Sequence, residues 1–153
     1  MKILLAACNA KYIHSNLAVY NLRAYAEDYR KNIILKEHVD DINEYYRKAA
    51  MYVLTSRYEG FGLVLTEAKT QGLPCISFNC PAGPKEIIAD GINGYLVDCF
   101  DIEQMAGKIN ELIENENKRK LFSENALVGT EKFKIEEIVE QWSELFTQLL
   151  TND

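Results

Sequence analysis

The amino-acid sequence predicts a three-layer α/β/α fold, in which a parallel sheet of about five strands lies between helices and further helices follow at the C-terminus. Short apolar runs alternate along the whole chain with longer segments whose apolar residues recur at helical spacing. Continuous apolar runs are typical of strands covered on both faces, and parallel neighbours need a crossover helix between them. Since 153 residues suffice for one core, we expect residues 1–153 to form a single α/β domain.

Five runs have the character of strands, because each is short, mainly apolar and bounded by polar or turn-forming residues. They lie at residues 3–7, 33–35, 52–55, 74–78 and 94–97. The chain has four cysteines and no Cys-x-x-Cys pair, and three of the four lie in or just after predicted strands. A thiol there behaves as a small apolar side chain, so we expect no metal site or disulfide.

The helices are predicted from apolar spacing and from their end signals. Ser15 or Asn16 caps the first helix, Asp40 the second and Asp101 the fourth, while Gly72 ends the third. The expected helices cover residues 17–29, 42–49, 60–71, 102–113 and 135–149.

The last of these helices has a long apolar face that must be covered by something. It carries Ile135, Ile138, Val139, Trp142, Leu145, Phe146 and Leu149. We expect the face to dock on the chain's own sheet; the alternative is that it pairs with a second copy to form a homodimer.

Composition excludes several classes of partner. Lys and Arg total 17 against 23 Asp and Glu, a formal net charge of -6, so no broad basic surface for nucleic acid or anionic lipid is expected. No apolar run approaches the ~20 residues that cross a bilayer. The opening residues 1–8 are too short for a secretory signal peptide. We therefore expect a cytoplasmic protein with no nucleic-acid or membrane partner.

Residues 56–68 form the segment that carries chemistry. They lie where the third predicted strand gives way to a helix, at the carboxyl end of the sheet, where open α/β folds bind ligands. Gly60 and Gly62 allow close backbone approach, and the amides of the first helical turn can receive a diphosphate. Glu59 and Glu67 can accept hydrogen bonds from both hydroxyls of a ribose or hexose diol. Spacing alone leaves open that both are solvated surface residues.

The Glu-x7-Glu spacing within Glu-Gly-Phe-Gly-Leu-Val-Leu-Thr-Glu-Ala, residues 59–68, resembles the donor motif of retaining GT-B glycosyltransferases of the family-four type. The similarity continues over residues 39–46, 72–77, 80–88 and 90–97. Residues 38–150 thus resemble the C-terminal, nucleotide-sugar-binding lobe of that family.

This resemblance implies donor-binding roles within one short segment. Glu59 and the backbone of Phe61 and Gly62 would face the donor sugar and phosphates, and Glu67 would face the ribose. The implied donor-binding residues are Glu59, Gly60, Phe61, Gly62, Leu63 and Glu67. We assign no catalytic residue, no cofactor and no metal.

Residues 1–31 resemble a different family. Residues 1–20 are similar to the start of the cobalamin-binding, flavodoxin-like domain of some radical-SAM proteins. At the positions of that family's Asp-x-His-x-x-Gly motif this chain has Asn9, Lys11 and His14, so no cobalt ligand is carried over. Neither the strand and loop whose Arg and Lys neutralise the donor diphosphate nor the acceptor-binding lobe is recognised.

We therefore interpret the chain as an engineered, de novo chimera with a junction between residues 30 and 40 and the flavodoxin-like, Rossmann-like strand order 2-1-3-4-5. Such a fold would have no selected catalytic activity and at most a vestigial UDP-sugar site, with affinity no better than about millimolar, ~4 kcal/mol. Transfer by this chain alone is not expected, because the cations that stabilise the leaving diphosphate are missing. The alternative is a natural, truncated donor-binding lobe of a retaining glycosyltransferase, which transfers sugar from a nucleotide-sugar together with a partner lobe.

Overall fold

A computed structural model describes residues 41–151 of the chain. The predicted strands at residues 3–7 and 33–35, the predicted helix at 17–29 and the capping residue Asp40 lie outside the described residues.

The described strands form one parallel sheet. They are β1 (Tyr52–Leu54), β2 (Cys75–Phe78) and β3 (Gly94–Val97), in the order β1-β2-β3. Val53 lies opposite Ile76, which in turn lies opposite Tyr95. The α/β class and parallel pairing are confirmed, but the structure describes three strands where five were predicted, because the first two fall outside residues 41–151.

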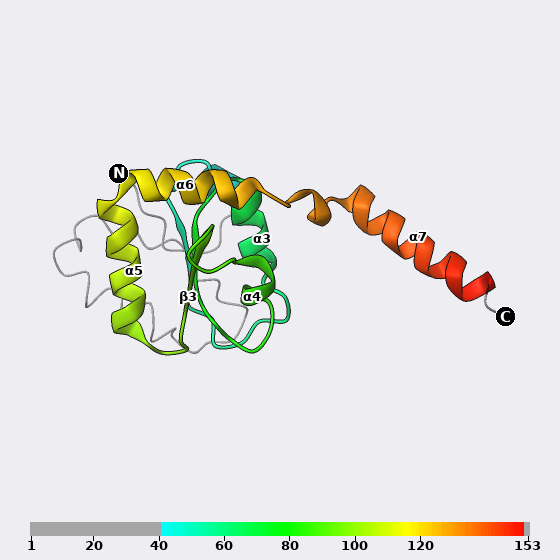
Figure 1. Ribbon diagram of the computed structural model, residues 1–153, viewed down its shortest axis with the longest axis horizontal. Helices are drawn as coiled ribbons and strands as arrows, with labels where there is room; N and C mark the ends of the chain where they lie inside the picture. The colour runs from blue at the N-terminus through cyan, green and yellow to red at the C-terminus, as the bar shows by residue number, and fades with distance from the viewer. Residues whose placement is uncertain (1–40, 152–153) are drawn as a thin grey trace.

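Side chains alternate between the two faces of this sheet, as the strand period of two requires. Val53, Ile76 and Val97 belong to the core on one face, with α5 (Ile102–Glu114) and Phe122 of α6 (Glu116–Leu127). On the other face the strands pack against α2 (Asn43–Tyr46), α3 (Leu63–Thr70) and α4 (Pro84–Ile87), through Tyr46, Leu65, Ala68 and Ile87. Helices on both faces give the predicted three layers (Figure 1).

The third predicted helix begins later than expected. Gly62 has φ 88° and ψ 51°, a left-handed conformation that an α-helix cannot contain, so α3 begins at Leu63 and not at Gly60. Its end is as predicted, because Gly72, at φ 73°, donates its N–H to the Lys69 carbonyl at 2.9 Å. These two glycines therefore set both limits of α3.

Side chains cap the helices that follow the sheet. Asp101 accepts the Gln104 N–H at 2.9 Å at the start of α5, as predicted. Asn115 does the same for Lys118 at the start of α6, a helix that the periodicity does not separate from its neighbours. The Ser123 hydroxyl donates to the Gly72 carbonyl at 2.6 Å and fastens α6 over the end of α3.

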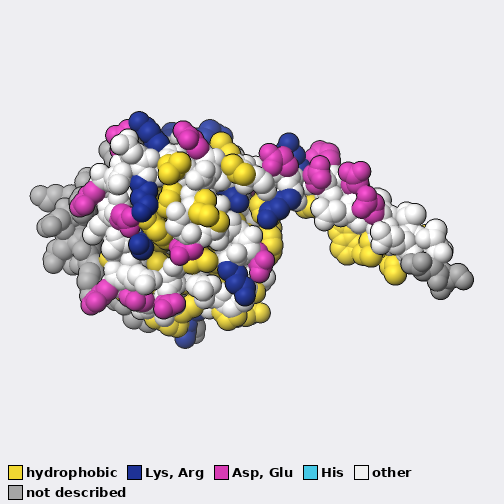
Figure 2. Space-filling model, viewed as in Figure 1, with side chains coloured by type: hydrophobic (Ala, Val, Ile, Leu, Met, Phe, Trp, Pro, Cys, Tyr) yellow, Lys and Arg dark blue, Asp and Glu magenta, His cyan; other side chains and the backbone are white. Residues whose placement is uncertain are grey.

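The last helix, α7 (Ile135–Thr151), follows the 3₁₀ turn η2 (Glu131–Phe133) and projects from the body of the protein (Figure 1). Within the described part of the chain α7 buries no side chain, so the expected docking on the chain's own sheet is wrong. Figure 2 shows apolar side chains gathered on this helix, where Trp142 remains 54% exposed. Among residues 41–151 no helix is long and apolar enough to span a membrane.

Candidate functional site

The candidate site lies at the carboxyl edge of the sheet. Because the three strands are parallel, the loops that follow them, residues 55–62, 79–83 and 98–101, leave the sheet at the same edge. The first loop carries four of the predicted donor-binding residues, Glu59, Gly60, Phe61 and Gly62, and leads into α3, which carries Leu63 and Glu67.

The N-terminus of α3 presents backbone donors. The first intrahelical bonds run from the N–H groups of Leu65 and Thr66 to the Gly62 carbonyl, at 2.9 and 3.4 Å. The amides of Leu63 and Val64 precede these bonds, so they lie in the turn where a helix offers donors and the positive end of its dipole. This geometry suits an anion such as a phosphate.

Gly83, in the loop after β2, packs against the backbone of the loop that follows β1. Its φ of 89° and ψ of -69° are unfavourable for a residue with a side chain. A Cβ at Gly83 would lie 2.1 Å from the Phe61 carbonyl oxygen, so only glycine lets the loop after β2 pack directly on Phe61. No role for Gly83 was predicted from the sequence, although the Gly-Pro pair at residues 83–84 is a turn signal.

The side chains of the predicted segment remain accessible. Phe61 is 41% exposed and Leu63 67% exposed. The Phe61 ring meets the Phe133 ring of η2 edge to face, with centroids 6.2 Å apart. A Cβ at Gly60 would meet nothing within 4 Å, so packing against the described residues does not require glycine there and the space above Gly60 is open.

The two predicted carboxylates have different neighbours. The Tyr46 hydroxyl donates to Glu67 Oε2 at 3.2 Å, so α2 holds the exposed Glu67 side chain on α3. Glu59 is half-buried in the loop. The pKa of the Cys80 thiol is raised first by burial and then by the nearby Cys99 and Glu59. Glu59 therefore lies close to Cys80 in the loop after β2. The periodicity did not predict this hydrogen bond, because it identified Tyr46 only as part of an apolar helix face.

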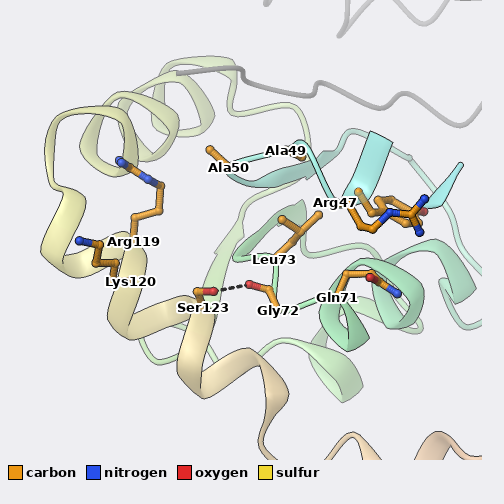
Figure 3. A pocket seen from close by; sticks show the side chains of 10 residues that line it. Arg47, Ala49, Ala50, Gln71, Gly72, Leu73, Arg119, Lys120 and Ser123 are labelled. Atoms are coloured by element: carbon orange, nitrogen blue, oxygen red, sulfur yellow. Dashed lines mark hydrogen bonds between the residues drawn. The ribbon is translucent and has the colours of Figure 1, made fainter. Parts of the chain in front are cut away.

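A pocket of about 380 Å³ lies at the opposite edge of the sheet (Figure 3). Its lining includes Ala50, which precedes β1, and Leu73, which precedes β2. Of its cations, Arg119 donates to the Leu112 and Ile113 carbonyls at the end of α5, and Lys120 pairs with Glu116 at 2.7 Å. The pocket contains none of the predicted donor-binding residues. Arg119 joins α6 to the end of α5, whereas the pair of Lys120 with Glu116 lies within α6.

The comparison with protein families decides the identity. Residues 14–128 match the family described as "Glycosyl transferases group 1". The chain belongs to this family. The match runs through residues 30–40, where the chimera hypothesis placed a junction, and natural glycosyltransferases are among the chain's relatives. The interpretation as an engineered chimera without selected activity is therefore wrong, and cobalamin binding is not proposed.

Two of the relatives are bacterial glycosyltransferases. The chain is 41% identical over 104 residues to the amylovoran biosynthesis glycosyltransferase AmsD of Erwinia amylovora, covering 68% of this chain and 29% of AmsD. It is 31% identical over 121 residues to the poly(glycerol-phosphate) alpha-glucosyltransferase of Bacillus subtilis, covering 79% of this chain and 18% of that protein.

A solved structure of a glycosyltransferase is similar to this chain in both sequence and fold. The pneumococcal O-GlcNAc transferase GtfA, crystallised with UDP and GlcNAc, is 31% identical with a TM-score of 0.70, over 86% of this chain and 27% of GtfA. The chain thus spans less than a third of the length of these three relatives. Its α/β fold is that of a GT-B-like donor-binding lobe.

Proposed function

We propose that this chain is the donor-binding lobe of a retaining glycosyltransferase, a single α/β domain that holds a nucleotide-sugar of the UDP class for transfer to an acceptor on a partner lobe. The observation that carries the proposal is the glycine loop at the carboxyl end of β1, which delivers the N-terminus of α3 to the sheet edge with Glu67 one turn into the helix.

The backbone around Gly62 is suited to the diphosphate. The Leu63 and Val64 amides precede the intrahelical bonds of α3, and the helix dipole adds positive potential at the same place. The left-handed Gly62 lets the chain turn into the helix without a side chain over these amides. A phosphate oxygen bound there would accept hydrogen bonds without requiring a basic side chain.

The carboxylates are suited to hydroxyl groups. A carboxylate accepts hydrogen bonds at both oxygens, which matches the two hydroxyls of a ribose. The Tyr46 bond restrains Glu67, so part of the entropy cost of ordering this exposed side chain is met before the ligand binds. Glu59, placed before the glycines, would accept from a hydroxyl of the donor sugar.

The proposed chemistry breaks the bond between the sugar's anomeric carbon and a diphosphate oxygen, so that the nucleoside diphosphate leaves. The anomeric carbon bonds to the oxygen of an acceptor hydroxyl, whose proton is released. This lobe would bind and orient the donor, and we assign none of its residues to the bond-making step. The complex of GtfA with UDP and GlcNAc supports the nucleotide-sugar class. The similarity to the poly(glycerol-phosphate) alpha-glucosyltransferase of Bacillus subtilis supports a polymer as one class of acceptor for such a lobe.

The test is a titration of the isotope-labelled chain with UDP, UDP-glucose and UDP-N-acetylglucosamine, followed by two-dimensional NMR. We expect saturable shifts with Kd of about 1 mM, or ~4 kcal/mol. Glu67→Gln removes the charged acceptor and should weaken UDP binding about tenfold, ~1.4 kcal/mol. Glu124→Gln, an equally conservative change at an exposed site on α6, should leave the affinity unchanged. Absence of saturable shifts at high ligand, or equal losses in both variants, would remove the proposal.

A further inference from the structure

The short turn η2 places one aromatic ring against the candidate donor-binding loop. Phe133, the last residue of η2, is half-buried, and its ring lies 6.2 Å from the Phe61 ring at an interplanar angle of 70°. This is an edge-to-face arrangement, which adds favourable quadrupole contact to apolar burial. η2 belongs to the segment that joins α6 to α7, about 70 residues after Phe61 in the sequence (Figure 1).

The backbone and the ring of Phe61 are held by different elements. Gly83 packs on the Phe61 carbonyl, where a Cβ would come within 2.1 Å of the oxygen. The Phe61 ring remains 41% exposed and takes no part in either of the two core clusters of the described residues. Phe133 is therefore the described aromatic partner that limits how this ring can rotate.

An electrostatic interaction also links η2 to α3. The pKa of Lys69 in α3 is lowered, first by burial and then by the charge of Lys132, so the two ammonium groups are close enough to repel. Lys132 also lies over the Phe133 ring, with Nζ 4.9 Å from the centroid. The Lys69 ammonium donates to the Ile87 carbonyl at 3.3 Å. η2 thus meets both the loop that precedes α3 and the charge on α3 itself.

We propose that Phe133 is a positioning residue for donor binding: its ring fixes the Phe61 side chain, and through it the Gly62 turn whose following amides receive the diphosphate. This inference rests on the proposed function for its ligand. Loss of the Phe133 ring would let Phe61 rotate over the open space beside Gly60, and the loop would have to be ordered again on binding.

The experiment compares four single variants and one double variant of the full chain by NMR, without ligand and during titration with UDP. Phe133→Ala should move the amide resonances of residues 60–63 and weaken UDP binding about fivefold, ~1 kcal/mol. Phe133→Tyr keeps the ring and should bind within about twofold of the unaltered chain. Phe146→Ala is the matched control, because it removes an exposed ring paired with Trp142 at 5.6 Å on α7 and should change neither quantity. Phe61→Ala completes a double-mutant cycle, in which Phe133→Ala should have no further effect.

Two results would overturn the inference. The first is that the amide resonances of residues 60–63 are unchanged in Phe133→Ala. The second is that Phe133→Ala weakens UDP binding by the same factor in the unaltered chain and in the Phe61→Ala variant. Failure of the unaltered chain to bind UDP would count against the proposed function instead, and the ligand-free resonances of residues 60–63 would still decide whether Phe133 positions the loop.

Discussion

Replacing Gly83 by alanine tests the tightest contact in the candidate site. The backbone of Gly83 has φ 89° and ψ -69°, and the added Cβ would lie 2.1 Å from the carbonyl oxygen and 2.5 Å from the carbonyl carbon of Phe61. Neither atom can rotate away as the end of a flexible side chain can, so the loop before α3 or the turn before α4 has to move.

The magnitude follows from two separable costs. Holding a residue with a side chain in such a backbone conformation costs about 1–3 kcal/mol. Overpacking costs about the same again, because backbone must shift to admit the methyl group. We expect Gly83→Ala to lower the free energy of unfolding by about 4 kcal/mol, a large part of the 5–15 kcal/mol typical of a domain.

Gly91→Ala is the matched control. Gly91 also has a positive φ, 71°, but a Cβ there meets nothing within 4 Å, so only the conformational cost of about 1–2 kcal/mol applies. Urea unfolding followed by circular dichroism measures both variants. Equal losses of stability in the two variants would refute the argument, since the contact with Phe61 would then contribute nothing.

Four further predictions concern elements around the site. Asp101→Ala should lower the free energy of unfolding by about 1 kcal/mol in urea, because it removes the 2.9 Å cap on the Gln104 N–H. Gly107→Ala should instead raise it by about 0.5–1 kcal/mol, since this position inside α5 has open space for a methyl group. Hydrogen bonds from Lys118 and then Tyr95 lower the pKa of Glu111 from 4.5 to about 2 in the folded protein. The contribution of Glu111 to stability is therefore present above pH 4.5 and is lost as the pH falls towards 2. In Glu111→Gln, the urea midpoint should depend less on pH over that range. Burial raises the pKa of the Cys75 thiol to about 12, so iodoacetamide at pH 8 should label the half-buried Cys99 well before Cys75, as peptide mass spectrometry would show.

The sheet was predictable because its signals are local. Each described strand is an apolar run bounded by turn residues, and the observed bounds Tyr52–Leu54, Cys75–Phe78 and Gly94–Val97 differ from the predicted ones by at most one residue. The end of α3 at Gly72 was also predictable, because a glycine after the last helical residue takes the left-handed conformation that ends a helix.

The features that were missed depend on contacts distant in sequence. Periodicity continued α3 back to Gly60, because it carries no information on the left-handed conformation of Gly62. The packing of Gly83 on Phe61 and the bond from Tyr46 to Glu67 arise only when separate loops and helices meet. Amphipathicity identified the apolar face of α7 but could not state what covers it, and the predicted docking on the sheet was wrong.

The chimera interpretation was wrong for a related reason. A strand followed by an amphipathic helix has the same pattern of apolar and polar residues in every α/β family, so about 30 residues cannot distinguish one family from another. The family match from residue 14 to residue 128 supplies the longer comparison that the local pattern lacked.

The central claim is that the donor is held at the carboxyl edge of the sheet. The most direct test is to identify, by NMR, the amide resonances that shift when UDP is added. We predict saturable shifts of the amide resonances of Gly62, Leu63, Val64 and Glu67. Movement confined to the pocket at the opposite edge, around Arg47 and Arg119, would contradict it, and so would no movement at all.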